Sequence, residues 1–106
     1  MSNCIFCNIV SGKIPGTFIY QDNEFIVIND IHPRAPVHML VITKKHIADF
    51  ANADTSLLQT LFILLKNIIK EHHVKNYRLV TNGEGAAVID HFHVHLMGQV
   101  AKDRDL

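Results

Sequence analysis

Three histidines alternate with apolar residues in segment 91–97, which reads His-Phe-His-Val-His-Leu-Met. Successive side chains of an extended chain point to opposite faces, so this pattern predicts a strand with two very different faces. Phe92, Val94 and Leu96 would enter a core, whereas the three imidazoles would form a polar row with about 7 Å between neighbours. The segment therefore favours a sheet that packs on one face and carries a functional site on the other.

The size and composition of the chain exclude several classes of protein. Its 106 residues suffice for one domain, which we place at 1–106. A hydrophobic fraction of 48% with 19% charged residues predicts a packed core rather than a disordered chain. Ten basic side chains balance ten acidic ones, and this neutrality argues against a nucleic-acid partner or a basic membrane anchor.

No segment predicts export or membrane insertion. Residues 1–4 lack a basic start and a long apolar stretch, so we expect no secretory signal. The most apolar segment, 57–69, is too short and too polar to span a bilayer. Two closely spaced cysteines, Cys4 and Cys7, do not make a disulfide framework. We therefore expect a cytoplasmic protein with reduced thiols.

Short apolar runs separated by turn residues predict five strands and two helices. Because hairpins rather than βαβ units join the strands, we expect an α+β fold with a five-stranded antiparallel sheet, one short helix and one long helix. The predicted strands are 18–20, 24–29, 37–43, 77–81 and 91–97, and the predicted helices are 44–51 and 55–73, the second with Asp54 as its N-cap.

The long helix carries two adjacent rows of apolar residues at helical spacing. A stripe this wide covers more than one surface, so one side would pack on the sheet and the other would meet a second copy of the chain. We therefore expect a homodimer; the alternative is that other parts of the same chain cover this stripe. The rows are Leu57, Leu61, Leu64, Ile68 and Leu58, Phe62, Leu65, Ile69.

The histidine row has three interpretations. It is a solvated strand face, a ligand set for a transition metal, or a phosphate site. In a phosphate site, a neutral imidazole acts as the nucleophile near pH 7 and its neighbours donate to phosphate oxygens.

The spacing Cys4-x-x-Cys7 is also ambiguous by itself. A redox motif needs a helix in a βαβ context, which Gly12 to Gly16 interrupt. Half of a zinc site fits better, because Zn²⁺ takes two thiolates at this spacing and two ligands from elsewhere. The alternative is a pair of ordinary buried thiols.

Several segments together resemble the histidine triad (HIT) superfamily. The pattern His-x-His-x-His followed by two apolar residues is the family's motif, and segments 4–15, 28–38 and 40–47 resemble its opening segment, nucleotide loop and central strand, in the same order. The likeness spans nearly the whole chain. The compact size and the cysteine pair are similar to the Hint-like branch, which implies a HIT-like fold.

The resemblance implies hydrolysis at the α-phosphate of a nucleotide conjugate, such as a nucleoside 5′-phosphoramidate. By position, His93 would attack phosphorus and form a nucleotidyl-histidine, which water then hydrolyses. His95 would contact a phosphate oxygen or pass a proton, and His38 would support it from the neighbouring strand. The expected substrate is a purine nucleotide conjugate of AMP or GMP.

The resemblance also implies a nucleotide pocket and a structural zinc ion. Asp30 would accept hydrogen bonds from the ribose hydroxyls. Ile9 and Ile28 would either line the pocket for the base or simply belong to the hydrophobic core. The remaining members of the expected set follow: the apolar base slot contains Phe6, Ile9, Ile28 and Ile31, Asn82 ends the fourth strand, and the zinc ligands are Cys4, Cys7, His46 and His91.

One departure from the family pattern affects the expected activity. Ala87 and Val88 stand where the family commonly has Gln-Ser or Gln-Thr at the phosphate site, and they supply no side-chain donor. One lost donor at developing charge costs about 10²–10³ in rate. We therefore expect a slow enzyme, a different leaving-group preference, or a nucleotide-binding protein with little turnover. A metal-dependent hydrolase that uses the three triad histidines as ligands is a third hypothesis.

Overall fold

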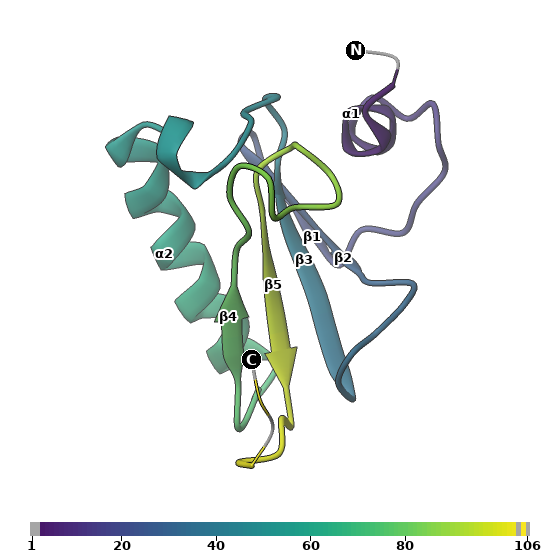
Figure 1. Ribbon diagram of the computed structural model, residues 1–106. Coiled ribbons are helices and arrows are strands. Elements are labelled where there is room, and N and C mark those ends of the chain that lie inside the picture. Colours follow the sequence, from purple (N-terminus) through teal and green to yellow (C-terminus); the bar gives the residue numbers. More distant parts are fainter. Residues whose placement is uncertain (1–2, 104, 106) are drawn as a thin grey trace.

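The chain forms one antiparallel sheet with strand order β1-β2-β3-β5-β4, flanked by helices (Figure 1). The computed structural model describes residues 3–103 and 105. Antiparallel pairing joins β2 to β3, and β3 to β5, at the centre of the sheet. The elements in chain order are α1 (Ile5–Val10), β1 (Tyr20–Gln21), β2 (Phe25–Asn29), β3 (Val37–Thr43), the 3₁₀ helix η1 (Phe50–Asn52), α2 (Thr55–Glu71), β4 (Arg78–Val80) and β5 (His93–Gly98).

The predicted α+β fold with a five-stranded antiparallel sheet is confirmed, and strand alternation gives the sheet two different faces. One face packs on α2, because Val27, Val41 and Val94 stand side by side in the register and point to the same side. They form the main core with the buried residues of the helix, which are Leu61, Leu64, Leu65 and Ile68.

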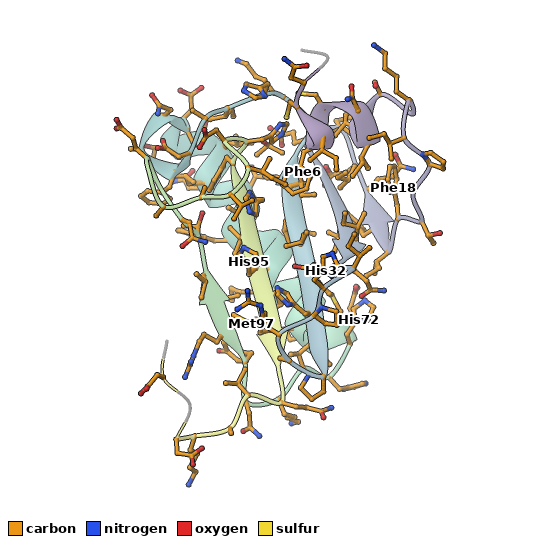
Figure 2. All side chains as sticks on the ribbon, turned by 45° about the vertical axis from the view of Figure 1, so that its right-hand side comes forward. Phe6, Phe18, His32, His72, His95 and Met97 are labelled. Atoms are coloured by element: carbon orange, nitrogen blue, oxygen red, sulfur yellow. The ribbon has the colours of Figure 1, made fainter. Side chains whose placement is uncertain are left out.

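The opposite face carries a smaller apolar cluster and the histidines. Ile26, Ile42 and His93 are neighbours in the register, as are Leu40 and His95. Phe6 of α1 packs on Ile26 and Ile42 at one end of this face, while His95 and Met97 continue along β5 (Figure 2). The sheet thus lies between α2 on one side and α1 on the other (Figure 1).

The helix α1 was not among the predicted elements. Its N-cap is Cys4, whose sulfur accepts a hydrogen bond from the backbone N–H of Cys7 at 3.4 Å. Phe6 is the buried residue of this helix. The Cys-x-x-Cys segment therefore starts a short helix. A helix of six residues is too short to show the repeated apolar spacing from which helices are predicted.

The predicted short helix at 44–51 is wrong. Only Phe50–Asn52 forms a single 3₁₀ turn. The backbone before it is used in other contacts: the N–H of Lys44 donates to the carbonyl of Glu24, and the carbonyl of Ile47 accepts from Phe92 at 2.6 Å. These long-range bonds occupy groups that a helix would need for itself.

The fifth strand begins at His93, so the prediction that His91 belongs to it is also wrong. The N–H of His91 bonds to the carbonyl of Ile89, a local turn that precedes the ladder. The first strand is likewise displaced, to Tyr20–Gln21, and the fourth is shorter than 77–81. Ladder bonds formed with distant strands set these boundaries, so local patterns locate them poorly.

The long helix begins and ends close to its predicted limits. Asp54 occupies the N-cap position, but its side chain makes no capping hydrogen bond. On its outer side Phe62 and Ile63 are 53% and 63% exposed. Within the part of the chain that the structure describes, no helix is long and apolar enough to cross a membrane.

At Gly98, the last residue of β5, the backbone lies very close to the side chains of Val74 and Val37. A Cβ atom there would lie 2.7 Å from Cγ1 of Val74 and 3.0 Å from Cβ of Val37. Neither neighbour is the flexible tip of a long side chain, so a methyl group forces a shift of packed atoms.

We therefore predict that Gly98→Ala lowers the free energy of unfolding by about 1–3 kcal/mol, the usual cost of overpacking. Urea unfolding monitored by circular dichroism measures it. Gly16→Ala is the matched control, because a Cβ there meets Ile9 and Phe18 at ordinary distances of 3.6 and 3.7 Å. Equal stability of the two variants would contradict the prediction.

Candidate active site and metal centre

Two cysteines and two histidines meet where α1 approaches the start of β5. The ligand atoms of Cys4, Cys7, His46 and His91 all lie within 4.8 Å of one another. Nδ1 of His91 is 3.2 Å from Sγ of Cys4 and 3.5 Å from Sγ of Cys7, and Nδ1 of His46 is 3.2 Å from Sγ of Cys7. The structure therefore brings together all four residues predicted as metal ligands.

Hydrogen bonding determines which nitrogen of His91 faces the sulfurs. The ring is fully buried, and its Nε2 lies 2.7 Å from the carbonyl oxygen of Thr43. A carbonyl only accepts, so Nε2 carries the proton and Nδ1 presents its lone pair to both cysteines. Burial lowers the pKa of His91, which keeps the ring neutral as a ligand requires.

The donor set and its spacing fit a tetrahedral metal ion. With Zn–S near 2.3 Å and Zn–N near 2.0–2.1 Å, sulfur and nitrogen ligands stand roughly 3.5 Å apart. Burial and the neighbouring Cys4 raise the pKa of the Cys7 thiol, a cost that a bound divalent cation reverses by stabilising thiolates. The four side chains could thus hold a metal, and two of them come from distant parts of the chain.

His93 has one nitrogen fixed by the backbone and one left for chemistry. Its Nδ1 lies 2.6 Å from the carbonyl oxygen of His91, so Nδ1–H donates and Nε2 keeps an unprotonated lone pair. The ring is only 8% exposed and packs edge-on against Phe6, with centroids 5.0 Å apart. This tautomer is the one that a nitrogen nucleophile needs.

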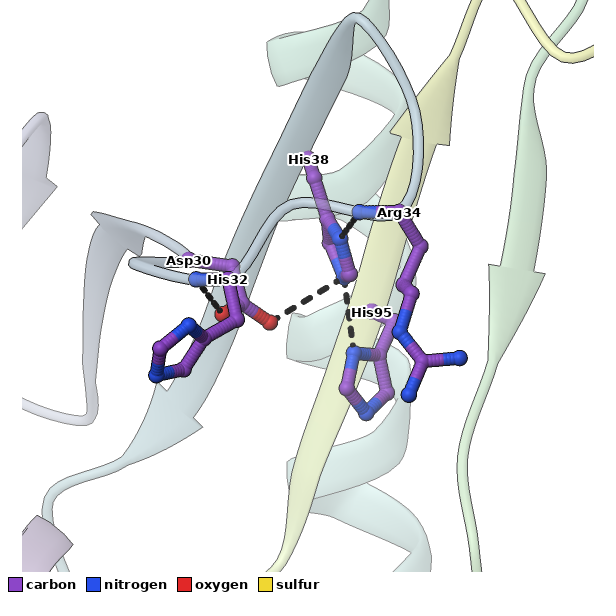
Figure 3. Close-up of polar contacts among 5 residues, drawn as sticks. All are labelled: Asp30, His32, Arg34, His38 and His95. Carbon is purple, nitrogen blue, oxygen red and sulfur yellow. Dashed lines mark hydrogen bonds and ion pairs between the residues drawn. The ribbon is translucent and has the colours of Figure 1, made fainter.

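A second network joins His38 and His95 across β3 and β5. The backbone N–H of Arg34 donates to Nδ1 of His38 at 2.9 Å, so the proton of that ring must be on Nε2 (Figure 3). This Nε2–H lies 2.9 Å from Nδ1 of His95. Nδ1 of His95 is consequently the acceptor, and its Nε2–H is a donor for a ligand.

Asp30 completes this network. Its Oδ2 lies 3.4 Å from Nε2 of His38, and its Oδ1 accepts from the backbone N–H of His32 at 2.8 Å (Figure 3). Burial, with the nearby His93 and His38, lowers the pKa of His95, although Asp30 opposes the shift. His95 is therefore neutral near pH 7 and acts as a hydrogen-bond donor there.

These assignments separate the three triad histidines. Among the residues that the structure describes, His91 groups with the cysteines, whereas His95 groups with Asp30 and His38. His38 has no lone pair to spare for a cation, because Nδ1 accepts from the backbone and Nε2 is protonated. The hypothesis of a three-histidine metal site therefore finds no support in the geometry.

The predicted nucleotide residues lie partly around this site. Ile9 and Ile28 are partly buried and pack on the apolar cluster that contains Phe6, so they contribute to the core on this face of the sheet. Ile31, in contrast, is 85% exposed. Asn82 follows β4, is half-buried, and precedes the loop that leads to the triad.

The loop from Asn82 to His91 brings no donor side chain at the predicted phosphate positions. Val88 is fully exposed and Ala87 is half-buried. A cavity of about 410 Å³ lies beside the cysteine–histidine group and is lined by Val88, Ile89, Asp90, Asn3, Cys4, Ile5 and His46. This cavity therefore opens next to the candidate metal centre.

Three residues with clear roles were missed by the sequence analysis. The carbonyl of Thr43 accepts a hydrogen bond from Nε2–H of His91. The hydroxyl of Thr81 donates a hydrogen bond to the carbonyl of His93 at 2.8 Å. Arg34 orients His38 through its backbone. Two of the three act through the main chain, which no residue type reveals. The one available signal in the sequence is the polar Thr43 at the end of the predicted apolar strand 37–43.

Comparison with known proteins agrees with this geometry. A family model described as "Scavenger mRNA decapping enzyme C-term binding" matches residues 3–104. The chain is 35% identical to Protein HitA of Neisseria gonorrhoeae over 104 residues, which cover 92% of this chain and 97% of that protein.

Solved structures share the whole fold. A HIT family hydrolase from Clostridium thermocellum superposes with a TM-score of 0.85 at 34% identity, covering 100% of this chain and 98% of the other. A histidine triad protein from Clostridium difficile gives a TM-score of 0.88 at 27% identity, with coverage of 100% and 98%.

Proposed function

This chain belongs to the histidine triad family, and from that premise we propose that it is a nucleotidyl hydrolase acting through His93. Its substrates are nucleoside 5′-phosphoramidates or related purine nucleotide conjugates, cleaved at the α-phosphate. The observation that carries the proposal is the hydrogen bond from Nδ1–H of His93 to the carbonyl of His91, which leaves Nε2 as a free nucleophile.

The reaction has two displacements at phosphorus. In the first, the lone pair on Nε2 of His93 forms a bond to phosphorus, and the leaving group departs with the electrons of its own bond; a leaving amine also takes up one proton from solvent water, whereas a leaving phosphate departs as the anion. In the second, water attacks phosphorus and gives up one proton to solvent, the electrons of the phosphorus–nitrogen bond return to Nε2, and the mononucleotide leaves with the water oxygen. Dividing one difficult displacement into two lowers each barrier.

The neighbouring residues have distinct supporting roles. His95 donates its Nε2–H to an oxygen on phosphorus or on the leaving group, and His38 holds the tautomer that makes this donation available. The carboxylate of Asp30 accepts hydrogen bonds from ribose hydroxyls. Phe6, with Ile9 and Ile28, forms one wall for the base.

A nucleotide-binding protein with little turnover is the second candidate. It is favoured by Ala87 and the fully exposed Val88, which offer the phosphate no side-chain donor. The same pocket would then recognise a nucleotide without cleaving it efficiently.

We predict that incubation with an adenosine phosphoramidate or an aminoacyl-adenylate leaves a nucleotidyl adduct on His93, detectable by intact mass spectrometry. His93→Ala removes the adduct and lowers turnover on the order of 10³–10⁶-fold, since it removes the nucleophile. His72→Ala is the control, because this exposed histidine ends α2. Nucleotide binding with neither adduct nor turnover favours the second candidate instead.

We also propose that the metal held by Cys4, Cys7, His46 and His91 is a structural Zn²⁺ ion. Two thiolates and two neutral imidazoles suit Zn²⁺ better than Mg²⁺ or Ca²⁺, which prefer oxygen ligands. All four ligands come from the protein, so the ion would hold α1 against the start of β5 rather than take part in the chemistry.

Purified protein is accordingly predicted to contain about one zinc per chain by elemental analysis. Cys4→Ser and Cys7→Ser lower that ratio, whereas His72→Ala retains it. Removing the ion with a chelator lowers stability, by about 4 kcal/mol if free zinc stood near 1,000 times its dissociation constant. A metal-to-protein ratio near zero in fresh wild-type protein would overturn the assignment.

Two copies of the chain are proposed to pair through exposed apolar residues of α2 and β4. β4 is an edge strand, and Leu79 within it is exposed on the side of the sheet that faces α2, opposite Leu96. Phe62 and Ile63 are exposed on the helix. An edge strand beside an apolar helix face can pair with itself about a two-fold axis.

Sedimentation equilibrium at micromolar concentration is expected to give about twice the chain mass of 12.0 kDa. Ile63→Glu shifts the equilibrium toward the monomer, because it places a charge in the contact. Gln21→Glu, at an exposed position of β1 on the opposite edge of the sheet from β4, serves as the control. A wild-type mass near 12.0 kDa would refute the dimer.

A further inference from the structure

Arg34 holds a defined position beside the predicted catalytic histidines. It lies in the loop between β2 and β3, where Pro33 and Pro36 restrict the backbone. Its own N–H is bonded to His38, and Asp30 holds the N–H of His32 at the other end of the loop. The loop is thus tied to the histidine network at two points, while the Arg34 side chain is exposed.

Arg34 and His93 lie on opposite sides of His95, as the register of β5 and the bond between Arg34 and His38 show. Along β5 the order is His93, His95 and then Met97, and Met97 pairs with His38, to which the Arg34 backbone is bonded. The guanidinium group of Arg34 lies beside the His95 ring, on the other side of that ring from Asp30 (Figure 3).

In-line displacement assigns a direction to the substrate. The attacking and leaving atoms occupy opposite ends of the transition state at phosphorus. With Nε2 of His93 attacking from one end, the leaving group departs toward the side of His95 that carries Arg34. The leaving group would then meet a cation and the Nε2–H of His95.

The protons that His38 and His95 carry restrict which leaving groups can depart easily from the substrate. His38 holds one proton on Nε2 and accepts the backbone N–H at Nδ1, and His95 holds one proton on Nε2. Transfer of the His95 proton to a leaving amine would produce an imidazolate, which is unfavourable. A departing phosphate carries its negative charge without that proton.

We infer that Arg34 is a specificity-determining residue that favours substrates whose leaving group is anionic, joined to the nucleotide through a phosphoanhydride bond. This inference rests on the proposed nucleotidyl transfer to His93. The bond from Nε2 to phosphorus forms, the phosphorus–oxygen bond breaks, and the electron pair stays on the departing phosphate oxygen. The guanidinium group and the Nε2–H of His95 donate to that phosphate.

Turnover of two substrates separates this role from a general one. The ratio of kcat/KM for a diadenosine polyphosphate to that for adenosine 5′-phosphoramidate is measured for wild type, Arg34→Gln, Arg34→Lys and Lys66→Gln. A charge-assisted hydrogen bond predicts that Arg34→Gln lowers kcat/KM about 10–100-fold for the polyphosphate and less than about threefold for the phosphoramidate. Arg34→Lys recovers part of the ratio, and the exposed α2 residue Lys66 leaves it unchanged.

Calorimetric binding provides a readout that does not need turnover. Wild type is expected to bind the methylene-bridged analogue of ADP more tightly than AMP, and Arg34→Gln to remove that preference. If AMP binds and the nucleotidyl adduct forms but the preference survives in Arg34→Gln, the role of Arg34 is refuted and the proposed function stands. If neither nucleotide binds and no adduct forms, the proposed function is refuted, and so is the role of Arg34 that rests on it.

Discussion

The hydrogen bond between Nδ1–H of His93 and the carbonyl of His91 is the interaction on which the rest of the site depends. At 2.6 Å it commits the Nδ1–H of the His93 ring to the backbone and leaves Nε2 for a bond to phosphorus. The same residue that supplies the carbonyl directs its own imidazole toward Cys4 and Cys7. The candidate metal centre and the candidate nucleophile therefore share one short stretch of backbone.

Two further histidines of the site, His91 and His38, also have a ring nitrogen committed to a backbone group. The carbonyl of Thr43 accepts a hydrogen bond from Nε2–H of His91, and the N–H of Arg34 donates to Nδ1 of His38. Burial lowers the pKa of His95 and keeps it neutral. With His91 and His95 neutral, the site offers hydrogen-bond donors but few protons to transfer, and this links its geometry to the kind of bond it can break.

The two faces of the sheet divide structural and functional duties. Val41 and Val94 face α2 in the main core, whereas their strand neighbours Leu40, His93 and His95 face the site. Because side chains alternate, β3 and β5 supply both faces at once. These two strands are central in the sheet, and Phe6 packs edge-on against the ring of His93, which is only 8% exposed.

Period-two alternation in 91–97 and period-3.6 spacing in 55–71 are local properties, so the sequence alone was enough to predict the histidine strand and the long helix. The candidate roles of His38, His93 and His95 came from the resemblance to the histidine triad family. The sequence did not determine that 5–10 is helical, that 44–49 is not, or that His91 leaves the strand, because bonds to residues 20 or more positions away decide these. The tautomers and the place of Arg34 likewise belong to the tertiary structure. Proton positions depend on which backbone groups face each ring, and a residue's identity does not record its neighbours in space.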